Sequence, residues 1–549
     1  MRSLLNLLKR IKSKQLKLKF IRLLFVTILL KLVGAISPLI AKKLIDTAVY
    51  TRNMQSFKNF GILYVGITIL FIMLLSVRYF YEKLFYVDVL NSLRKNVLNK
   101  IYSSRAMHVL EKDSGYFIQR INSDVKSIAS FFSTDVNVFV TNVIISVIIF
   151  YLMVELSFRL TLVVVILFIF FYIVSKKILP IIKRLSRKLM ETEEELNTIT
   201  NDSVVGLLHI KSFNLQNYMR GKVIEVLGKY TETLKKYTLY GVIFDILIVS
   251  GTLNLVDTVI EVGGGVLILR SVISVGTLMA FMSYFYKIWD SVEVVLDFPR
   301  TLREKGVSAE RVLELFNLPE EDNSLTSEID IDEIDTIVLE DIELSLGNRK
   351  IFDGLNLRIK KKDHICILGD NGTGKTTLCR LLVRIIEPDR GTVYINGIDY
   401  KKLSPVVLRS KIMHIPQEPF IFRGSIEENI YFDVSPHKKD SFPSYFMETQ
   451  KKNAGEVVDN KNTNLSGGEK KLIQLARGLY RDGEVYIIDE PFAFVDAKYT
   501  EILKDFIEKQ FKNKTLIVIT HDKTILSSLC EKVYVLEKGR IRKYQHYKH

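Results

Sequence analysis

A glycine-rich stretch in the second half of the chain has the residue types and spacing that bind phosphate groups. It reads Gly369-Asp370-Asn371-Gly372-Thr373-Gly374-Lys375-Thr376-Thr377. A strand-like run, His364 to Leu368, precedes it, and a helical pattern, Leu378 to Val383, follows. Glycines let backbone N–H groups turn inward around phosphates, and the helix N-terminus adds positive potential. Lys375 can reach the β- and γ-phosphates of a nucleotide, and the Thr376 hydroxyl can bind Mg²⁺. A glycine turn without a ligand would explain neither the strand nor the Lys-Thr pair, so we interpret the stretch as a nucleotide-binding P-loop.

Two further motifs narrow the class of nucleotide-binding protein. The apolar strand Val485 to Ile488 ends in Asp489 and Glu490, a pair that alone is common in α/β folds. Upstream, Leu465-Ser466-Gly467-Gly468-Glu469 opens a helix from Lys470 to Tyr480, and its glycine-rich N-terminus is a second place shaped for phosphate. A P-loop, LSGG and Ile-Ile-Asp-Glu-Pro in this order resemble the ATP-binding cassette superfamily.

The resemblance implies a role for each matching position. Asp489 would hold Mg²⁺, and Glu490 would be the general base for ATP hydrolysis. Gln417, in Ile-Pro-Gln, matches a residue that approaches Mg²⁺ or water and relays the nucleotide state to the membrane part. Asp496 matches a loop that communicates across a dimer, and His521, after the strand Thr515 to Thr520, matches a switch that contacts the γ-phosphate. A lone histidine is usually a surface or packed residue, and only its place at a strand end singles out His521.

The resemblance also implies a dimer. Ser466, Gly467 and Gly468 act in the family on the ATP held by the opposing cassette, and this chain has one cassette. Because Glu490 and His521 are both present, a homodimer with two competent sites is expected, with a heterodimer as the alternative.

Two positions depart from the family pattern. Leu346 stands where the family has an aromatic residue that stacks on adenine, so we expect weaker and less base-selective nucleotide binding. Glu469 replaces the commoner glutamine of the signature, for which we expect a small effect. The segment from Tyr431 to Asn464, where the family has a helical subdomain, is short.

Composition divides the 549 residues into an apolar first half and a second half typical of a soluble α/β protein. The net charge of +16 could indicate nucleic-acid binding, but many basic residues lie beside long apolar runs. The positive-inside rule explains that distribution better, so we expect no nucleic-acid partner. The three cysteines, Cys366, Cys379 and Cys530, show no metal-ligand spacing, and we expect buried small residues in a reducing compartment.

Six apolar runs approach the roughly 20 residues that cross a bilayer. They are Leu23 to Ala41, Phe60 to Val77, Val136 to Val154, Leu160 to Ser175, Val242 to Leu269 and Val272 to Tyr286. The connections after the second and fourth runs are long and basic, which places them and both termini in the cytoplasm. We therefore expect an integral, multi-pass protein of the plasma membrane, in contact with membrane lipids.

The expected fold is a six-helix, all-α transmembrane domain followed by an α/β P-loop NTPase cassette. The parts are an amphipathic interfacial helix (1–22), the transmembrane domain with two long cytoplasmic loops (23–316), a linker (317–335) and the nucleotide-binding domain (336–549). By resemblance to exporters, a short coupling helix at the tip of each loop would lie near Lys112 to Tyr116 and near Phe213 to Asn217.

The fifth apolar run carries Asp257 and Glu261, which share one face of a helix because they are four residues apart. This face could line a cavity and meet a cationic part of the cargo. Alternatively, the acidic groups could pair with Lys31 or Arg270, or lie near the outer surface. The sequence leaves these alternatives open.

The whole pattern resembles a half-size exporter that couples ATP hydrolysis to efflux of an amphipathic cargo, such as a peptide, a lipid or a drug. An ATP-gated channel or regulator, or one half of a heterodimeric complex, is the alternative. Such a regulator needs no intact general base, whereas Glu490 is present.

Overall fold

The computed structural model describes residues 4, 6–7, 14–321, 331–432, 457–459, 465–481, 483–493, 495, 497–521 and 529–544. The chain forms two compact units. One consists of Met1–Leu98 and Gly115–Phe316, and the other of Asn99–Ser114 and Asn317–His549. The first is helical and the second is mixed α/β, which confirms the fold class expected from the sequence.

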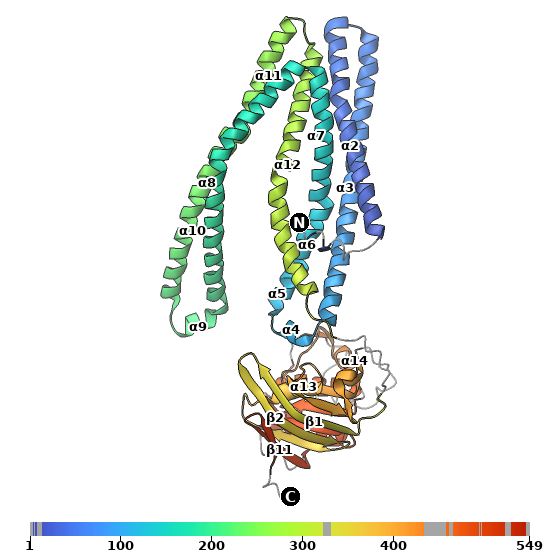
Figure 1. The fold of residues 1–549 in the computed structure, drawn as a ribbon, viewed down its shortest axis with the longest axis vertical. Helices are drawn as coiled ribbons and strands as arrows, with labels where there is room; N and C mark the ends of the chain where they lie inside the picture. Colours follow the sequence, from blue (N-terminus) through green and yellow to red (C-terminus); the bar gives the residue numbers. More distant parts are fainter. Residues whose placement is uncertain are drawn as a thin grey trace. The chain divides into compact units, whose positions relative to one another are not determined.

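Long helices make up the first unit. Figure 1 shows α8 running beside α10, and α12 beside α7 and α2. The helical segments are α2 (Lys14–Asp46), η1 (Thr47–Thr51), α3 (Met54–Ser103), α5 (Ser114–Gln119), η2 (Arg120–Asp124), α6 (Val125–Ser130), η3 (Phe131–Asp135), α7 (Val136–Leu156), α8 (Phe158–Val205), α9 (Leu207–Ser212), α10 (Gln216–Phe244), η4 (Asp245–Ser250), α11 (Gly251–Leu269) and α12 (Val275–Phe316). Residues 14–22, expected in a separate interfacial helix, are the first turns of α2, which continues into the first apolar run.

Among the described residues, five helical stretches are long and apolar enough to cross a membrane. They correspond to the first five predicted spans and are Lys14–Thr51, Met54–Ser103, Ser114–Leu156, Phe158–Val205 and Gly251–Leu269. The sixth prediction, Val272 to Tyr286, falls on a turn and the start of α12. Lys287 and Asp290 interrupt the apolar stretch of α12 and lower its mean hydropathy, so α12 is not among these five.

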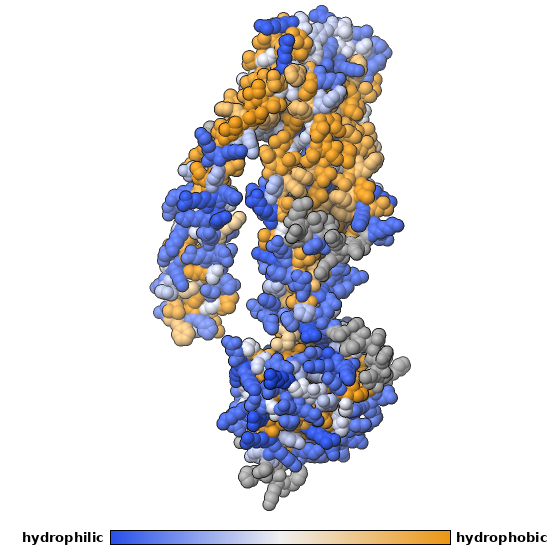
Figure 2. All heavy atoms as spheres, in the orientation of Figure 1, coloured by the Kyte–Doolittle hydropathy of each residue, from blue (hydrophilic) through white to orange (hydrophobic). Residues whose placement is uncertain are grey.

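A buried cluster holds the first unit together, while much of its apolar surface faces outward. Phe281, Tyr284 and Phe285 of α12 are fully buried against residues of α2, α7, α8 and α11. Figure 2 shows hydrophobic side chains gathered over the upper part of this unit, and mainly hydrophilic ones along the lower parts of α8 and α10. An apolar exterior at one end is the surface that a bilayer covers.

The second unit is built on two main sheets. A six-stranded sheet has the order β12-β11-β3-β10-β9-β6, in which only the β11–β12 pair is antiparallel. A four-stranded antiparallel sheet has the order β2-β1-β4-β5 (Figure 1). The strands are β1 (Thr336–Leu346), β2 (Arg349–Lys360), β3 (His364–Leu368), β4 (Arg390–Ile395), β5 (Ile398–Asp399), β6 (Ile412–Ile415), β7 (Gly424–Ser425), β8 (Val457–Val458), β9 (Val485–Asp489), β10 (Thr515–Thr520), β11 (Lys532–Glu537) and β12 (Arg540–Lys543). The helices are α4 (Ala106–Leu110), α13 (Lys375–Leu382), η5 (Tyr400–Lys402), α14 (Pro405–Lys411), α15 (Ile426–Tyr431), α17 (Gly467–Tyr480) and α18 (Ala497–Phe511).

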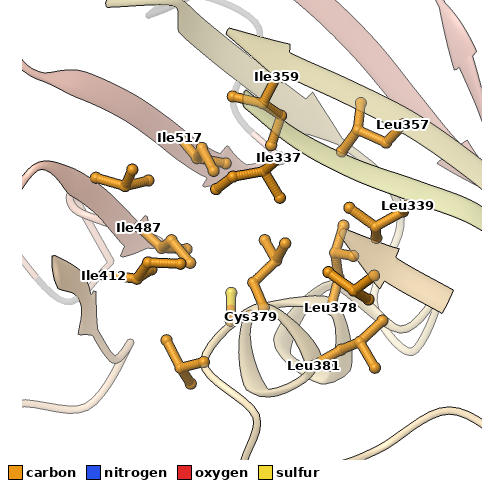
Figure 3. Packing of buried hydrophobic residues seen from close by; sticks show 14 of the residues in the cluster. Ile337, Leu339, Leu357, Ile359, Leu378, Cys379, Leu381, Ile412, Ile487 and Ile517 are labelled. Carbon is orange, nitrogen blue, oxygen red and sulfur yellow. The ribbon is translucent and has the colours of Figure 1, made fainter. Parts of the chain in front are cut away.

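The core of the second unit lies around α13. Figure 3 shows Leu378 and Leu381 of α13 in one cluster with Ile337 and Leu339 of β1 and with residues of β2, β6, β9 and β10. Strands β9 and β10 are buried along their whole length, as expected of central parallel strands. This packing fixes α13, and with it the loop that precedes the helix, relative to the carboxyl ends of β3, β9 and β10.

The tips of the two long loops differ from the sequence expectation. The first loop has two short helices: α4, at Ala106–Leu110, ends before the expected position near Lys112 to Tyr116, and α5, at Ser114–Gln119, overlaps it. Helix α4 belongs to the second unit, where Arg105 N–H donates to Pro319 O at 2.9 Å and Met107 packs against the core around α13. In the second loop the short helix is α9, and Phe213 to Leu215 form the turn that follows it. Asn214 has a left-handed backbone there (φ 56°), so one continuous helix could not cover both segments.

The cysteines differ from expectation in one respect. All three are buried, as predicted, but Cys366 of β3 and Cys530 are joined by a disulfide, with their Cα atoms 5.6 Å apart. Cys379 of α13 is a free thiol. The sequence did not reveal the disulfide because the two cysteines are 164 positions apart and meet only through the pairing of β11 with β3.

Candidate nucleotide site

The glycine-rich loop predicted to bind phosphate connects β3 to α13, and its glycines are sterically required. Gly372 and Gly374 have left-handed backbones, with φ of 80° and 102°. A Cβ on Gly374 would lie 2.7 Å from Ile351 Cγ2, and one on Gly369 would lie 2.8 Å from Leu536 O. Other residue types would therefore distort the loop and move the backbone N–H groups at the start of α13. Such a cradle at a helix N-terminus fits a phosphate chain.

Lys375 has a buried ammonium at the start of α13. Its Nζ donates to Gly369 O at 2.6 Å and to Asp370 O at 3.2 Å, and lies 3.9 Å from Glu490 Oε1. The residue is only 8% exposed. A buried ammonium held mainly by neutral carbonyls is a favourable partner for an anion, so its position also fits a nucleotide phosphate.

Thr376 and Asp489 place two oxygen atoms beside this ammonium. Thr376 Oγ1 donates to Asp489 Oδ2 at 2.9 Å, which joins the second residue of α13 to the end of β9. Asp489 is buried, and burial raises the pKa of its carboxyl, opposed by the Thr376 hydrogen bond. A hydroxyl and a carboxylate are hard oxygen ligands, the kind that Mg²⁺ prefers.

Glu490 adopts a backbone conformation that is rare for its residue type. Its φ is 45°, in the left-handed region, and its N–H donates to Ile519 O at 2.8 Å. The side chain is 5% exposed and accepts a hydrogen bond from Thr520 Oγ1 at 3.3 Å. His521 Nδ1 lies 2.8 Å from Glu490 Oε1. Strained residues of this kind cluster at functional sites, and here the strain aims the carboxylate at the P-loop edge of the sheet.

The signature residues begin α17 with a complete capping box. Glu469 N–H donates to Ser466 Oγ at 3.3 Å, and Ser466 N–H donates to Glu469 Oε2 at 2.5 Å. Glu469, for which a small effect was expected, therefore caps the helix N-terminus. Ser466 and Gly467 are exposed, so they are available to another molecule.

Gln417 lies in the loop after β6, and the structure reveals a neighbour that the sequence reading missed. Lys471 of α17 is 1% exposed, and its Nζ donates to Pro416 O, Gln417 O and Asp489 O at 3.0, 2.9 and 3.3 Å. Burial lowers the pKa of Lys471 to about 8, although the carboxylates of Asp489 and Glu490 oppose the shift. Lys471 thus ties the Gln417 loop to the end of β9. The available signal was its position four residues before Leu475, on the buried face of α17.

Two further residues, Leu346 and Asp496, were singled out from the sequence. Leu346, at the end of β1, is half-buried and precedes the left-handed Gly347 that turns the chain into β2. Asp496 lies outside the described residues, as do most positions of the segment from Tyr431 to Asn464.

Polar groups also lie inside the helical unit. Lys31 of α2 donates to Asn142 Oδ1 of α7 at 2.6 Å, and Ser291 of α12 donates to the same oxygen at 3.1 Å. Asp257 of α11 is half-buried and forms a hydrogen bond with Tyr286. The hydrogen bond of Lys31 is thus to an amide rather than to the acidic pair considered from the sequence.

Comparison with known proteins finds a matching family model for each of the two units. Residues 20–289 match the family model of the ABC transporter transmembrane region, and residues 352–493 match that of the ABC transporter. The ABC transporter ATP-binding protein YknV of Bacillus subtilis is 24% identical over 98% of this chain and 90% of its own length. The ATP-dependent lipid A-core flippase of Desulfotalea psychrophila is 26% identical over 68% of this chain and 67% of its own length. The ATP-dependent permease MDL1 of Candida albicans is 30% identical over 62% of this chain and 52% of its own length.

Proposed function

Because this chain belongs to the ABC transporter family and is an ATP-driven membrane exporter with both domains in one polypeptide, we propose that two copies pair to form two complete ATP sites. The exposed Ser466 and Gly467 at the N-terminus of α17 support this proposal. The P-loop of each chain binds ATP, and the signature of its partner covers the γ-phosphate. A heterodimer is the alternative, and the presence of Glu490 and His521 in this chain favours the homodimer.

Each residue of the site has a stated role in this proposal. The glycine loop and Lys375 would hold the phosphates, and Thr376 and Asp489, with Gln417, would hold Mg²⁺. When bound, Mg²⁺ neutralises charge on the phosphate oxygens. Glu490 accepts a proton from the attacking water, and the hydrogen bond from Thr520 orients it. His521 is bonded to the same carboxylate and has an exposed side chain, so it can turn from Glu490 to the γ-phosphate. Asp496 links the two sites across the dimer.

The proposed cargo is amphipathic: a peptide, a lipid or a hydrophobic drug. The helical unit combines apolar surface with interior polar groups, including Lys31, Asn142 and Asp257. Relatives that include a lipid A-core flippase support a cargo with both polar and apolar parts. The basic connections after the second and fourth apolar runs, much of which lie in the extensions of α3 and α8, support a plasma-membrane orientation with both termini in the cytoplasm.

The hydrogen-bonded, strained Glu490 carries the proposal, and it can be tested directly. The Mg-ATPase of the lipid-reconstituted protein is measured beside Glu490→Gln and a matched control, Glu508→Gln on the exposed face of α18. Loss of the base should lower the rate by about 10²–10⁴-fold, while the control keeps the wild-type rate. Equal, measurable rates for wild type and Glu490→Gln would contradict the role of Glu490. Negligible rates in both would contradict the homodimer and favour a partner chain or an ATP-gated regulator.

The same preparation tests the acidic pair on α11. Stimulation of ATPase by cationic and anionic amphiphiles is compared between wild type and the Asp257→Asn, Glu261→Gln double variant. If this face meets a cationic part of the cargo, stimulation by cationic compounds falls several-fold and stimulation by anionic compounds does not. Identical profiles would contradict the hypothesis.

A further inference from the structure

Three potential metal ligands meet beneath the P-loop helix. Cys379 Sγ on α13, an imidazole nitrogen of His414 on β6 and a carboxylate oxygen of Asp489 on β9 all lie within 4.8 Å of one another. Figure 3 shows Cys379 on the side of α13 that faces Ile412 of β6 and Ile487 of β9. The parallel pairing of β6 with β9, in which His414 is opposite Ile487, holds two of the ligands in register.

Two of these groups have unused bonding capacity. Cys379 is a free, fully buried thiol. The Nε2 atom of His414 is buried and has no hydrogen-bond partner among the described residues. A buried polar atom without a partner is destabilising, and most such atoms in native proteins have a partner. Neither group has a part in the proposed hydrolysis of ATP.

The types of ligand indicate which cation the site would take. Thiolate and imidazole prefer borderline or soft ions such as Zn²⁺, whereas Mg²⁺ prefers oxygen ligands. Ligands at about 2.0–2.3 Å from one Zn²⁺ lie roughly 3.3–3.8 Å apart, so the trio needs to contract by only about 1 Å. The positive charges of Arg380 and Lys471 act on the His414 imidazole and oppose the binding of another cation there. We therefore expect an inhibitory site rather than a permanent structural one.

We propose that Cys379, His414 and Asp489 form a site for a thiophilic divalent cation such as Zn²⁺, and that its occupancy inhibits ATP hydrolysis. The thiol loses its proton to solvent on binding, as metal-bound thiols do. The inhibitory part rests on the proposed function, because it requires Asp489 to serve the nucleotide site through Thr376. A cation shared with Cys379 and His414 removes Asp489 from that task.

Binding is tested without any ATPase measurement. The purified full chain is titrated with Cd²⁺, and the thiolate-to-cadmium absorption band is followed. Since Cys366 and Cys530 are joined in the disulfide, Cys379 is the free thiol among the three cysteines. We expect the band in wild type and in the matched Cys366→Ala, Cys530→Ala control, loss of the band in Cys379→Ala, and at least tenfold weaker binding in His414→Gln. No band in wild type, or an unchanged titration in His414→Gln, would overturn the site.

Inhibition is tested on the reconstituted protein, preincubated with Zn²⁺ before Mg-ATP because the ligands are buried. Cys379→Ala and His414→Gln should keep the wild-type rate without Zn²⁺ and require at least tenfold more Zn²⁺ for half inhibition. Equal sensitivity of wild type and both variants would overturn the inhibitory role. A cadmium band beside an inactive wild type would refute the proposed function and leave the metal site standing.

Discussion

Apolar side chains have opposite positions in the two units. In the cassette, β9 and β10 are buried throughout, and Ile487 and Ile517 have no exposed surface. In the helical unit, Ile62, Met73 and Phe80 of α3 are 74%, 62% and 63% exposed. The difference lies in the solvent: water drives the first group inward, whereas lipid tails are as apolar as the second. An exposed isoleucine therefore carries no energetic penalty in a membrane helix, and shape and polar contacts set the packing there.

The largest expected difference between the two units is in the effect of replacing a glycine by alanine. Gly374→Ala should weaken ATP binding by more than about 100-fold, because left-handed strain and a clash with Ile351 together exceed about 3 kcal/mol. Gly372→Ala, with φ of 80° in the same loop and its nearest neighbour 3.6 Å away, isolates the strain. Gly265→Ala, in the middle of α11 and without a neighbour within 4 Å, should be neutral. Nucleotide titration measures all three, and similar affinities for Gly374→Ala and Gly372→Ala would show that the clash is unimportant.

Two lysines with interior hydrogen bonds, one in each unit, give the next contrast. Lys471→Met leaves three backbone carbonyls, of which that of Asp489 is buried, without this donor and should destabilise the cassette by about 3–5 kcal/mol. Lys31→Met should cost less, because Asn142 Oδ1 keeps its hydrogen bond from Ser291. The measurement is the apparent melting temperature, expected to fall by about 6–15 °C for Lys471→Met. A larger shift for Lys31→Met would reverse the comparison.

Truncation of isoleucine tests the difference in solvent directly. Ile487→Ala should cost about 2–5 kcal/mol, because it creates a cavity at a fully buried position. Ile62→Ala, on the exposed face of α3, should change stability by less than about 0.5 kcal/mol. Thermal unfolding of the lipid-reconstituted protein distinguishes them. A large effect of Ile62→Ala would mean that this face is buried in an interface of the assembled protein.

The smallest expected effect is on the contact between residue 346 and the adenine base of ATP. Leu346→Tyr adds an aromatic face at the end of β1, where stacking on a base contributes about 0.5–1.5 kcal/mol. ATP affinity should therefore rise about two- to tenfold, with a greater preference for ATP over other nucleotides. Leu346→Ile is the matched apolar control. Unchanged affinity of the tyrosine variant would mean that Leu346 does not face the base.

Local sequence patterns predicted the strand boundaries of the cassette more accurately than the positions of the short helices at the loop tips. Strands β3 and β10 begin and end at the residues predicted, because central parallel strands are continuous apolar runs bounded by polar residues. The helices at the loop tips were predicted less accurately: the first was expected beyond α4, overlapping the start of α5, and the second was expected just after α9. Their positions depend on packing, such as that of Met107 against the cassette core, which no local pattern records.

The sequence by itself determined the chemistry of the nucleotide site. The P-loop, the LSGG motif and the pair Asp489 and Glu490 each lie within a few consecutive residues, and turn geometry and helix N-termini are local properties. Only the tertiary structure decided which distant residues meet. Lys471 reaches the Gln417 loop, Cys366 pairs with Cys530, and Cys379 lies beside His414, because the strand order β11-β3-β10-β9-β6 is not the order of the chain. Such non-sequential pairing brings together side chains whose separation along the sequence carries no signal of contact.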